Sequence, residues 1–129
     1  MRLLLDTHVW LWWQLGSPRF GDESKRLLFD AGSTLYLSAA SAWEIAIKCA
    51  SGKLVLPAPP ASYIRERAAR EDFRVVDIRL EHALIAGSLE RHHDDPFDRM
   101  LVAQCIVDGF RLVTADHRLA AYGMDLVTI

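Results

Sequence analysis

The chain has 129 residues, of which 51% are hydrophobic and 25% are charged, and its formal net charge at pH 7 is −2. This composition is ordinary for a globular protein, so we expect one domain that spans residues 1–129 and buries its own core. The slightly negative charge excludes an overall basic protein, so nucleic-acid binding cannot be inferred from charge alone.

Two other classes of protein are excluded by the same simple counts. The cysteines, Cys49 and Cys105, are too few for a disulfide framework or a zinc site built from thiols, and we expect free core thiols in a reducing compartment. The apolar stretch at residues 1–15 is shorter than the roughly 20 residues that cross a bilayer, and no cleavage site follows it. We therefore expect a cytoplasmic protein without a membrane segment.

Short apolar runs alternate with helical patterns along the chain. Strands are predicted at residues 2–5, 35–37, 73–77, 111–114 and 125–129, with a further extended segment at 54–56. Helices are predicted at residues 7–15, 22–31, 41–51, 61–70, 80–89, 96–109 and 116–122. This alternation predicts an α/β fold with a mostly parallel central sheet, whose ligand crevice lies outside the carboxyl ends of the strands.

The helix that begins at Pro96 has the strongest local signals. Asp95 is a natural N-cap, and Pro96 suits the first helical position because its missing N–H is not needed there. Apolar residues occur on all sides of the helix over residues 97–110, as expected of a helix in the core. Asp98 is therefore predicted to be a carboxylate in the first turn of a buried helix.

Four acidic residues map to equivalent places in this scheme. Asp6 ends the first strand, and Glu44 lies near the start of the helix after the second strand. Asp98 opens the 96–109 helix, and Asp116 follows the fourth strand by two residues. Because strand ends of one kind share an edge of a parallel sheet, we expect the four carboxylates to form one cluster.

Each acid also has a local explanation. Asp6 and Asp116 suit N-caps, and Asp98 suits the positive end of a helix dipole. Glu44 fits a capping box with Ser41, or an ion pair with Lys48 four residues later.

Carboxylates that do converge cannot all stay ionised without a counter-charge. Mg²⁺ binds a few carboxylates together with water and substrate phosphates, and the sequence has no His and Cys set with zinc spacing. Such a site polarises a phosphodiester and supplies a metal-bound hydroxide. The acids therefore predict hydrolytic phosphoryl transfer.

Four segments, taken together, resemble the PIN-domain ribonucleases, and within them the VapC-type toxins of toxin–antitoxin pairs. These segments are LLLDTHVWLW at 3–12, SAASAWEIAIKCASGKL at 38–54, DPFDRMLVAQC at 95–105 and LVTADHRLAAYG at 112–123. The resemblance implies an α/β/α sandwich and an endoribonuclease that depends on Mg²⁺ or Mn²⁺. It departs from the family at Asp94, where relatives often carry a basic residue.

The same resemblance implies roles for individual residues. Asp6 and Asp98 match acids that bind the metal directly, Glu44 matches one that acts directly or through water, and Asp116 matches the last acid. Asp95 is interpreted first as a helix cap, with a further role in the outer shell of the site. Thr7 is a candidate to hydrogen-bond a metal-bound water, with an ordinary first-turn residue as the equal alternative.

Several other polar residues have weaker signals. Ser38 and Ser41 suit either the substrate path or helix caps, and Lys48 suits a surface ion pair better than a phosphate contact. His92 and His93 are interpreted as solvated loop residues. The basic run at residues 65–74 is interpreted as a solvated face because acidic residues interleave with it.

The family's partners are RNA, a small antitoxin of the VapB type and a second copy of the chain. Trp10, Trp12 and Trp13, with Leu27 and Leu28, fit either an antitoxin groove or plain core packing.

Two other functions remain open from the sequence. A Mg²⁺-dependent phosphatase would use Asp6 as its nucleophile, but such enzymes generally have a second acid two residues later, where this chain has His8. A catalytically silent domain that binds RNA or protein is the other alternative, and the complete set of four acids speaks against it.

Overall fold

The computed structural model describes residues 1–30 and 32–129. Within this part of the chain, five parallel strands form one sheet in the order β3-β2-β1-β4-β5. The strands are β1 (Arg2–Leu5), β2 (Thr34–Ser38), β3 (Arg74–Val76), β4 (Arg111–Thr114) and β5 (Leu126–Thr128). The α-helices are α1 (Thr7–Gln14), α2 (Asp22–Leu28), α3 (Ala39–Ala50), α4 (Pro60–Glu71), α5 (Leu80–Ser88) and α6 (Pro96–Asp108), and η1 (His117–Tyr122) is a 3₁₀ helix.

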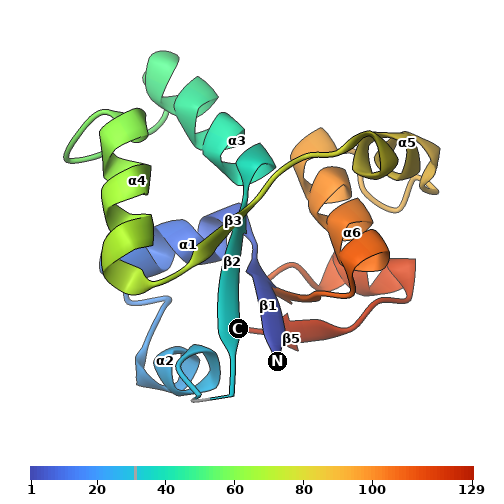
Figure 1. The fold of residues 1–129 in the computed structure, drawn as a ribbon, viewed down its shortest axis with the longest axis horizontal. Helices are drawn as coiled ribbons and strands as arrows, with labels where there is room; N and C mark the ends of the chain where they lie inside the picture. The colour runs from blue at the N-terminus through green and yellow to red at the C-terminus, as the bar shows by residue number, and fades with distance from the viewer. Residues whose placement is uncertain (31) are drawn as a thin grey trace.

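The sheet lies between two layers of helices, each with its own hydrophobic core. Alternate residues of a strand point to opposite faces, so β1 contributes Leu3 and Leu5 to one core and Leu4 to the other. The first core also holds apolar residues of α1, α2, α3 and α4, and the second holds those of α6 and η1. Figure 1 shows α1, α2 and α4 on one side of the sheet and α5 and α6 on the other. The predicted α/β/α sandwich with a parallel sheet is confirmed.

Several predicted boundaries differ from the structure for local reasons. Helix α3 begins at Ala39 because the Ser38 hydroxyl accepts a hydrogen bond of 3.0 Å from the Ala40 N–H, so the predicted capping box that starts at Ser41 is wrong. Residues 54–56 belong to no strand. Helix α2 ends at Leu28, and its predicted last residue, Ala31, lies outside the described residues.

The tryptophans of α1 do not share one role. Trp10 is fully buried, and its ring meets those of Tyr63 and Phe73 edge-on at 6.3 and 5.7 Å between centroids. Trp10 is therefore a core residue, and the groove interpretation is wrong for it. Trp12 and Trp13 are only partly buried, and Trp13 packs on Phe29 at 5.2 Å.

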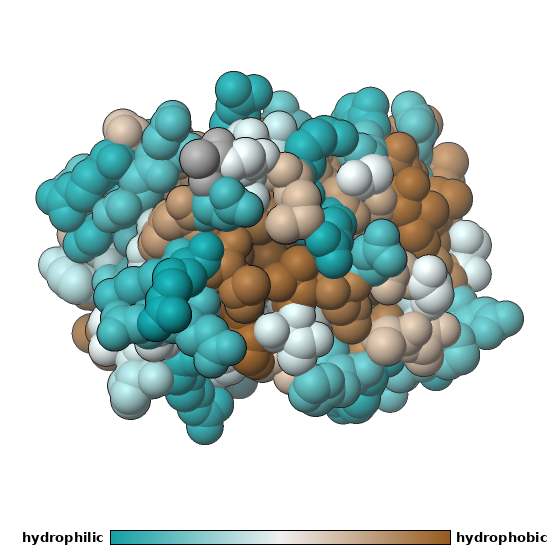
Figure 2. Space-filling view, turned by 90° about the horizontal axis from the view of Figure 1, so that it is seen from below, coloured by the Kyte–Doolittle hydropathy of each residue, from teal (hydrophilic) through white to brown (hydrophobic). Residues whose placement is uncertain are grey.

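The two ends of the strands form two different surfaces. In Figure 1 the amino ends of β1 and β2 lie at the bottom and both strands run upward. Figure 2 is seen from below, so it shows the face of the molecule at the amino ends of these strands. Hydrophobic surface lies near the middle of that face, bordered by hydrophilic side chains. The four predicted acids all lie toward the opposite edge of the sheet. Among the helices of the described residues, none has both the length and the apolar character that a bilayer crossing requires.

Candidate active site

Three of the four predicted acids line one cavity at the carboxyl edge of the sheet. Asp6 directly follows β1, Asp98 lies in the first turn of α6, and Asp116 follows β4 and caps η1. The cavity has a volume of about 410 Å³. Its lining residues are Asp6, His8, Trp12, His93, Asp95, Asp98, Ala115, Asp116 and Arg118.

Asp6 is buried, and both oxygens of its carboxylate are held by neighbouring elements. One oxygen accepts a hydrogen bond of 3.1 Å from the backbone N–H of His8, as expected for an N-cap. The other accepts a hydrogen bond of 2.7 Å from the hydroxyl of Thr114 at the end of β4. The carboxylate therefore has a fixed orientation, set by the first turn of α1 and by the end of β4.

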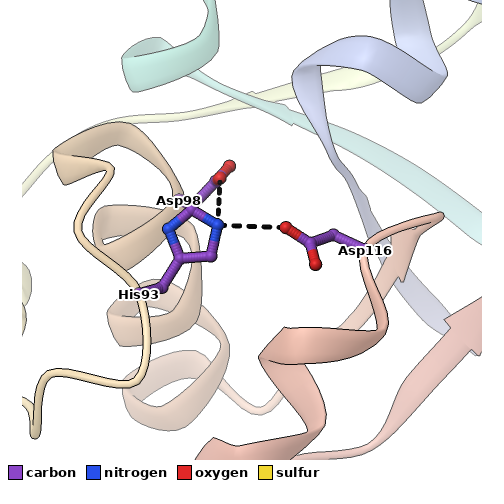
Figure 3. A group of neighbouring side chains, drawn as sticks. All are labelled: His93, Asp98 and Asp116. Atoms are coloured by element: carbon purple, nitrogen blue, oxygen red, sulfur yellow. Dashed lines mark hydrogen bonds and ion pairs between the residues drawn. The ribbon is translucent and has the colours of Figure 1, made fainter.

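Asp98 and Asp116 meet through His93, which comes from the loop between α5 and α6 (Figure 3). The His93 Nε2 lies 3.3 Å from Asp98 Oδ2 and 3.0 Å from Asp116 Oδ2. One ligand atom from each residue lies within 4.8 Å of the other two, so this group could hold a metal ion. The cluster therefore combines two carboxylates and one imidazole from three separate segments.

The environment of Asp98 strongly favours its protonated form. Burial raises the pKa of Asp98 from its ordinary value of 3.8 to about 7, and the charges of Asp6, Asp95 and Glu44 add to this effect, while His93 opposes it. Both burial and the neighbouring carboxylates therefore disfavour the ionised form of Asp98, with burial the larger cause. A bound divalent cation would favour the ionised form again.

Asp116 has the opposite environment, because Arg118 lies beside it. Hydrogen bonds from the Arg118 side chain are the main reason that the pKa of Asp116 lies well below its usual range. Arg118 Nε lies 2.9 Å from Asp116 Oδ1, and Nη2 lies 2.8 Å from Oδ2. Asp116 is therefore ionised and fully paired in this structure.

Glu44 is the predicted acid that does not reach the cavity lining in the described part of the chain. Its carboxylate is buried, and the Lys48 ammonium donates to it at 2.7 Å. The predicted ion pair is thus present, although one of its partners is buried rather than on the surface. The charge of Glu44 still contributes to the raised pKa of Asp98, so Glu44 lies behind the site and acts on it.

The two residues predicted for the outer shell lie near the acids in different ways. The Asp95 carboxylate accepts from the N–H groups of Phe97 at 2.8 Å and Asp98 at 3.3 Å, which confirms it as the N-cap of α6. It also lines the cavity. The buried Thr7 hydroxyl donates to the Ser41 hydroxyl at 2.8 Å, so it ties α1 to α3.

His93 is the site residue that the sequence interpretation missed. Only 7% of its side chain is exposed, so the prediction of a solvated loop residue is wrong. Its Nδ1 accepts a hydrogen bond of 3.1 Å from the Asp95 N–H, which turns Nε2 toward Asp98 and Asp116. The one local signal was its position two residues before an N-cap, where a side chain can accept that N–H. His92 is exposed, as predicted, and its Nε2 lies 3.0 Å from the Glu90 carboxylate.

Comparison with known proteins agrees with this geometry. A family model described as PIN domain matches residues 3–124. The curated protein Ribonuclease VapC22 of Mycobacterium tuberculosis (strain ATCC 25618 / H37Rv) is 32% identical over 121 residues, which cover 93% of this chain and 91% of that protein.

Solved structures of low sequence identity share the fold. The structure of VapBC2 from Rickettsia felis, bound to a DNA fragment from its promoter, matches with a TM-score of 0.74 and 15% identity, over 99% of this chain and 98% of that chain. VapBC-1 from nontypeable Haemophilus influenzae matches with a TM-score of 0.68 and 16% identity, over 99% and 98% of the two chains. The family model covers nearly the whole chain and the curated relative aligns along most of it, so the chain belongs to the PIN domain family.

Proposed function

We propose that this protein is a divalent-metal-dependent endoribonuclease and the toxin of a VapBC-type toxin–antitoxin pair. The observation that carries the proposal is the cavity that Asp6, Asp98 and Asp116 line together and in which the pKa of Asp98 is raised to about 7. Excess negative charge of this kind is what a divalent cation relieves. RNA as the substrate is supported by the name of the 32% identical relative, Ribonuclease VapC22.

The donor set fits Mg²⁺, with Mn²⁺ as the alternative. Carboxylate oxygens are the ligands that Mg²⁺ prefers, and a cavity of about 410 Å³ leaves room for water and a phosphate. Asp6, Asp98 and Asp116 would hold the ion, with the His93 imidazole as a further donor beside Asp98 and Asp116. Glu44 would act through its charge or through water. When bound, the ion would polarise the phosphodiester and lower the pKa of a bound water.

The remaining residues act by orienting these carboxylates. Thr114 and the His8 N–H hold the two oxygens of Asp6, so this acid has little freedom to turn away. Asp95 fixes the start of α6 and thereby the place of Asp98. Thr7 joins α1 to α3 through Ser41 and so supports Asp6 and Glu44 from the outer shell.

The proposed partners are a small antitoxin of the VapB type and a second copy of the chain, in the cytoplasm, with residues 1–129 acting as one domain. Apolar side chains at the surface of α3 and α5 support a protein partner, because large apolar groups are exposed there. These residues are Trp43, Ile47, Leu80 and Leu84. The toxin–antitoxin complex from Klebsiella pneumoniae, a solved structure of similar fold, supports the antitoxin as a partner.

The direct test is cleavage of structured RNA by the purified full chain with Mg²⁺, with Mn²⁺ and with EDTA. We expect cleavage with either metal and none with EDTA. Asp6→Asn and Asp98→Asn should each abolish cleavage while the circular dichroism spectrum stays unchanged. The matched control is Asp94→Asn, because Asp94 lies in the adjoining loop with 90% of its side chain exposed. Full cleavage by both site variants would rule out the assignment.

The same preparation separates the two alternative functions. Turnover of a small phosphate ester without RNA cleavage would indicate a phosphatase. RNA binding that is insensitive to EDTA, without any cleavage, would indicate a binding module. Growth arrest on expression of this chain alone, relieved by a co-expressed small partner, would support the toxin role.

A further inference from the structure

Arg118 is the permanently charged cation among the described residues that line the acidic cavity. The imidazoles of His8 and His93 also line the cavity, together with four carboxylates. The Arg118 side chain is 71% exposed, so it lies at the mouth of the cavity and has room to move. Arg118 is therefore the one described lining residue whose positive charge does not depend on pH.

The contacts of Arg118 cover both oxygens of Asp116. Nε and the backbone N–H of Arg118 donate to Oδ1 at 2.9 and 3.0 Å, and Nη2 donates to Oδ2 at 2.8 Å. Asp98, in contrast, has His93 at 3.3 Å as its one ion-pair partner among the described residues. A divalent cation that approaches Asp116 must therefore share this carboxylate with a guanidinium of the same sign, and the two cations repel.

The substrate has the reverse requirement. A phosphodiester is an anion, and a cavity lined by four carboxylates repels it until positive charge is supplied. The planar fork of a guanidinium binds a phosphate through two parallel hydrogen bonds, in the same way that Arg118 now binds Asp116. An arginine released from Asp116 at the cavity mouth would lie where a phosphate of the incoming strand must pass.

We propose that Arg118 exchanges between two anionic partners, Asp116 when the divalent cation is absent and an RNA phosphate when the cation is bound. The second half of this proposal rests on the proposed nuclease function. Metal binding would release the Arg118 guanidinium from Asp116, and RNA binding would engage the released guanidinium. Each binding event therefore favours the other, because such coupling is reciprocal.

The sign of one measurement separates this role from a structural one. If Arg118 only positions Asp116 as a ligand, its removal should weaken metal binding. If Arg118 competes with the cation, its removal should strengthen metal binding. Arg118→Gln keeps a polar side chain of similar length without the charge, and Arg118→Lys keeps the charge but cannot bridge both oxygens.

The first experiment titrates the full chain with Mn²⁺ alone and measures free Mn²⁺ by electron paramagnetic resonance. We expect Arg118→Gln to bind Mn²⁺ about two- to five-fold more tightly than the parent, the range that corresponds to losing an exposed ion pair, with Arg118→Lys in between. The matched control is Arg70→Gln, which removes an exposed arginine paired with Glu66 at 3.0 Å outside the cavity and should leave the Mn²⁺ affinity unchanged. An unchanged or weaker Mn²⁺ affinity in both folded Arg118 variants overturns the proposal.

The second experiment measures binding of a short single-stranded phosphorothioate RNA by fluorescence anisotropy, with gel analysis to verify that the probe is intact. We expect Arg118→Gln to lose about five-fold in affinity with Mn²⁺ present, and to lose less in EDTA, where the parent Arg118 is occupied by Asp116. An equal loss in both conditions indicates general charge attraction and overturns the exchange.

Failure of the nuclease function gives a different pattern from failure of the exchange. Absence of cleavage of ordinary RNA by the parent chain with Mn²⁺ rejects the nuclease and with it the phosphate half of the proposal. The Mn²⁺ titration uses no RNA, so it still decides whether Arg118 competes for Asp116.

Discussion

Replacing Asp98 by Asn should stabilise the metal-free protein at alkaline pH. The folded protein raises the pKa of Asp98 from 3.8 to about 7, mainly by burial. Between these two values the folded state holds a proton that the unfolded state has released, so the free energy of unfolding falls as pH rises from about 4 to about 7. Above pH 7 the folded protein carries a buried, poorly balanced carboxylate. Asn removes this charge and resembles the protonated acid in shape.

The size of the effect follows from the pKa difference. About three pH units at about 1.4 kcal/mol each set a ceiling of about 4 kcal/mol. Water in the open cavity screens part of this charge, so we expect a gain of about 2 kcal/mol at pH 8 and a difference near zero at pH 4.

Urea denaturation in EDTA at several pH values measures this difference directly. Asp94→Asn, which changes an exposed carboxylate of the adjoining loop, should alter the free energy of unfolding by less than about 0.5 kcal/mol at every pH. The reasoning is refuted if Asp98→Asn is less stable than the parent at pH 8, or if its advantage does not grow between pH 4 and pH 8.

Three further predictions concern the metal, a thiol and a half-buried arginine. Mg²⁺ should raise the melting temperature of the parent but not of Asp6→Asn in a thermal shift assay, and equal shifts would contradict the ligand role of Asp6. Burial raises the pKa of the Cys105 thiol to about 12, so iodoacetamide should label Cys49 before Cys105. Mass spectrometry of the native protein would measure the two rates, and equal labelling of the two thiols would contradict the prediction. Arg99 donates to four backbone carbonyls, with that of Ala86 at 2.9 Å and that of Leu89 at 2.8 Å among them. Arg99→Met should therefore lower the free energy of unfolding, measured by urea denaturation, by about 2 to 3 kcal/mol. A loss below about 0.5 kcal/mol would refute this role of Arg99.

The two hydrophobic cores hold the acidic residues of the site in place. Asp6 and Asp116 follow strands whose apolar residues are completely buried, so their positions are anchored by both cores at once. The site can therefore hold like charges close together because the free energy of the surrounding core opposes their separation. This explains how a cluster with a raised pKa at Asp98 remains compatible with a stable fold.

The sequence by itself determined the order of elements, the parallel α/β fold and three acids of the site. The signals for these features are local: short apolar runs predict strands, and Asp6, Asp95 and Asp116 each accept the N–H two residues later, as N-caps do. Because carboxyl ends of parallel strands share an edge, a local assignment of each acid was enough to predict that Asp6, Asp98 and Asp116 lie on one side of the sheet, where they line one cavity.

Only the tertiary structure decided which side chains face the cavity. Glu44 lies on a correctly predicted helix, but that helix begins at Ala39, and the Glu44 carboxylate pairs with Lys48 behind the site. His93 enters the site because the loop after α5 folds back against η1, and Arg118 covers Asp116 because η1 turns its first residues toward the same space. The contacts of His93 join three separate segments, so they depend on the path of the loop after α5, which no residue pattern within a single segment encodes.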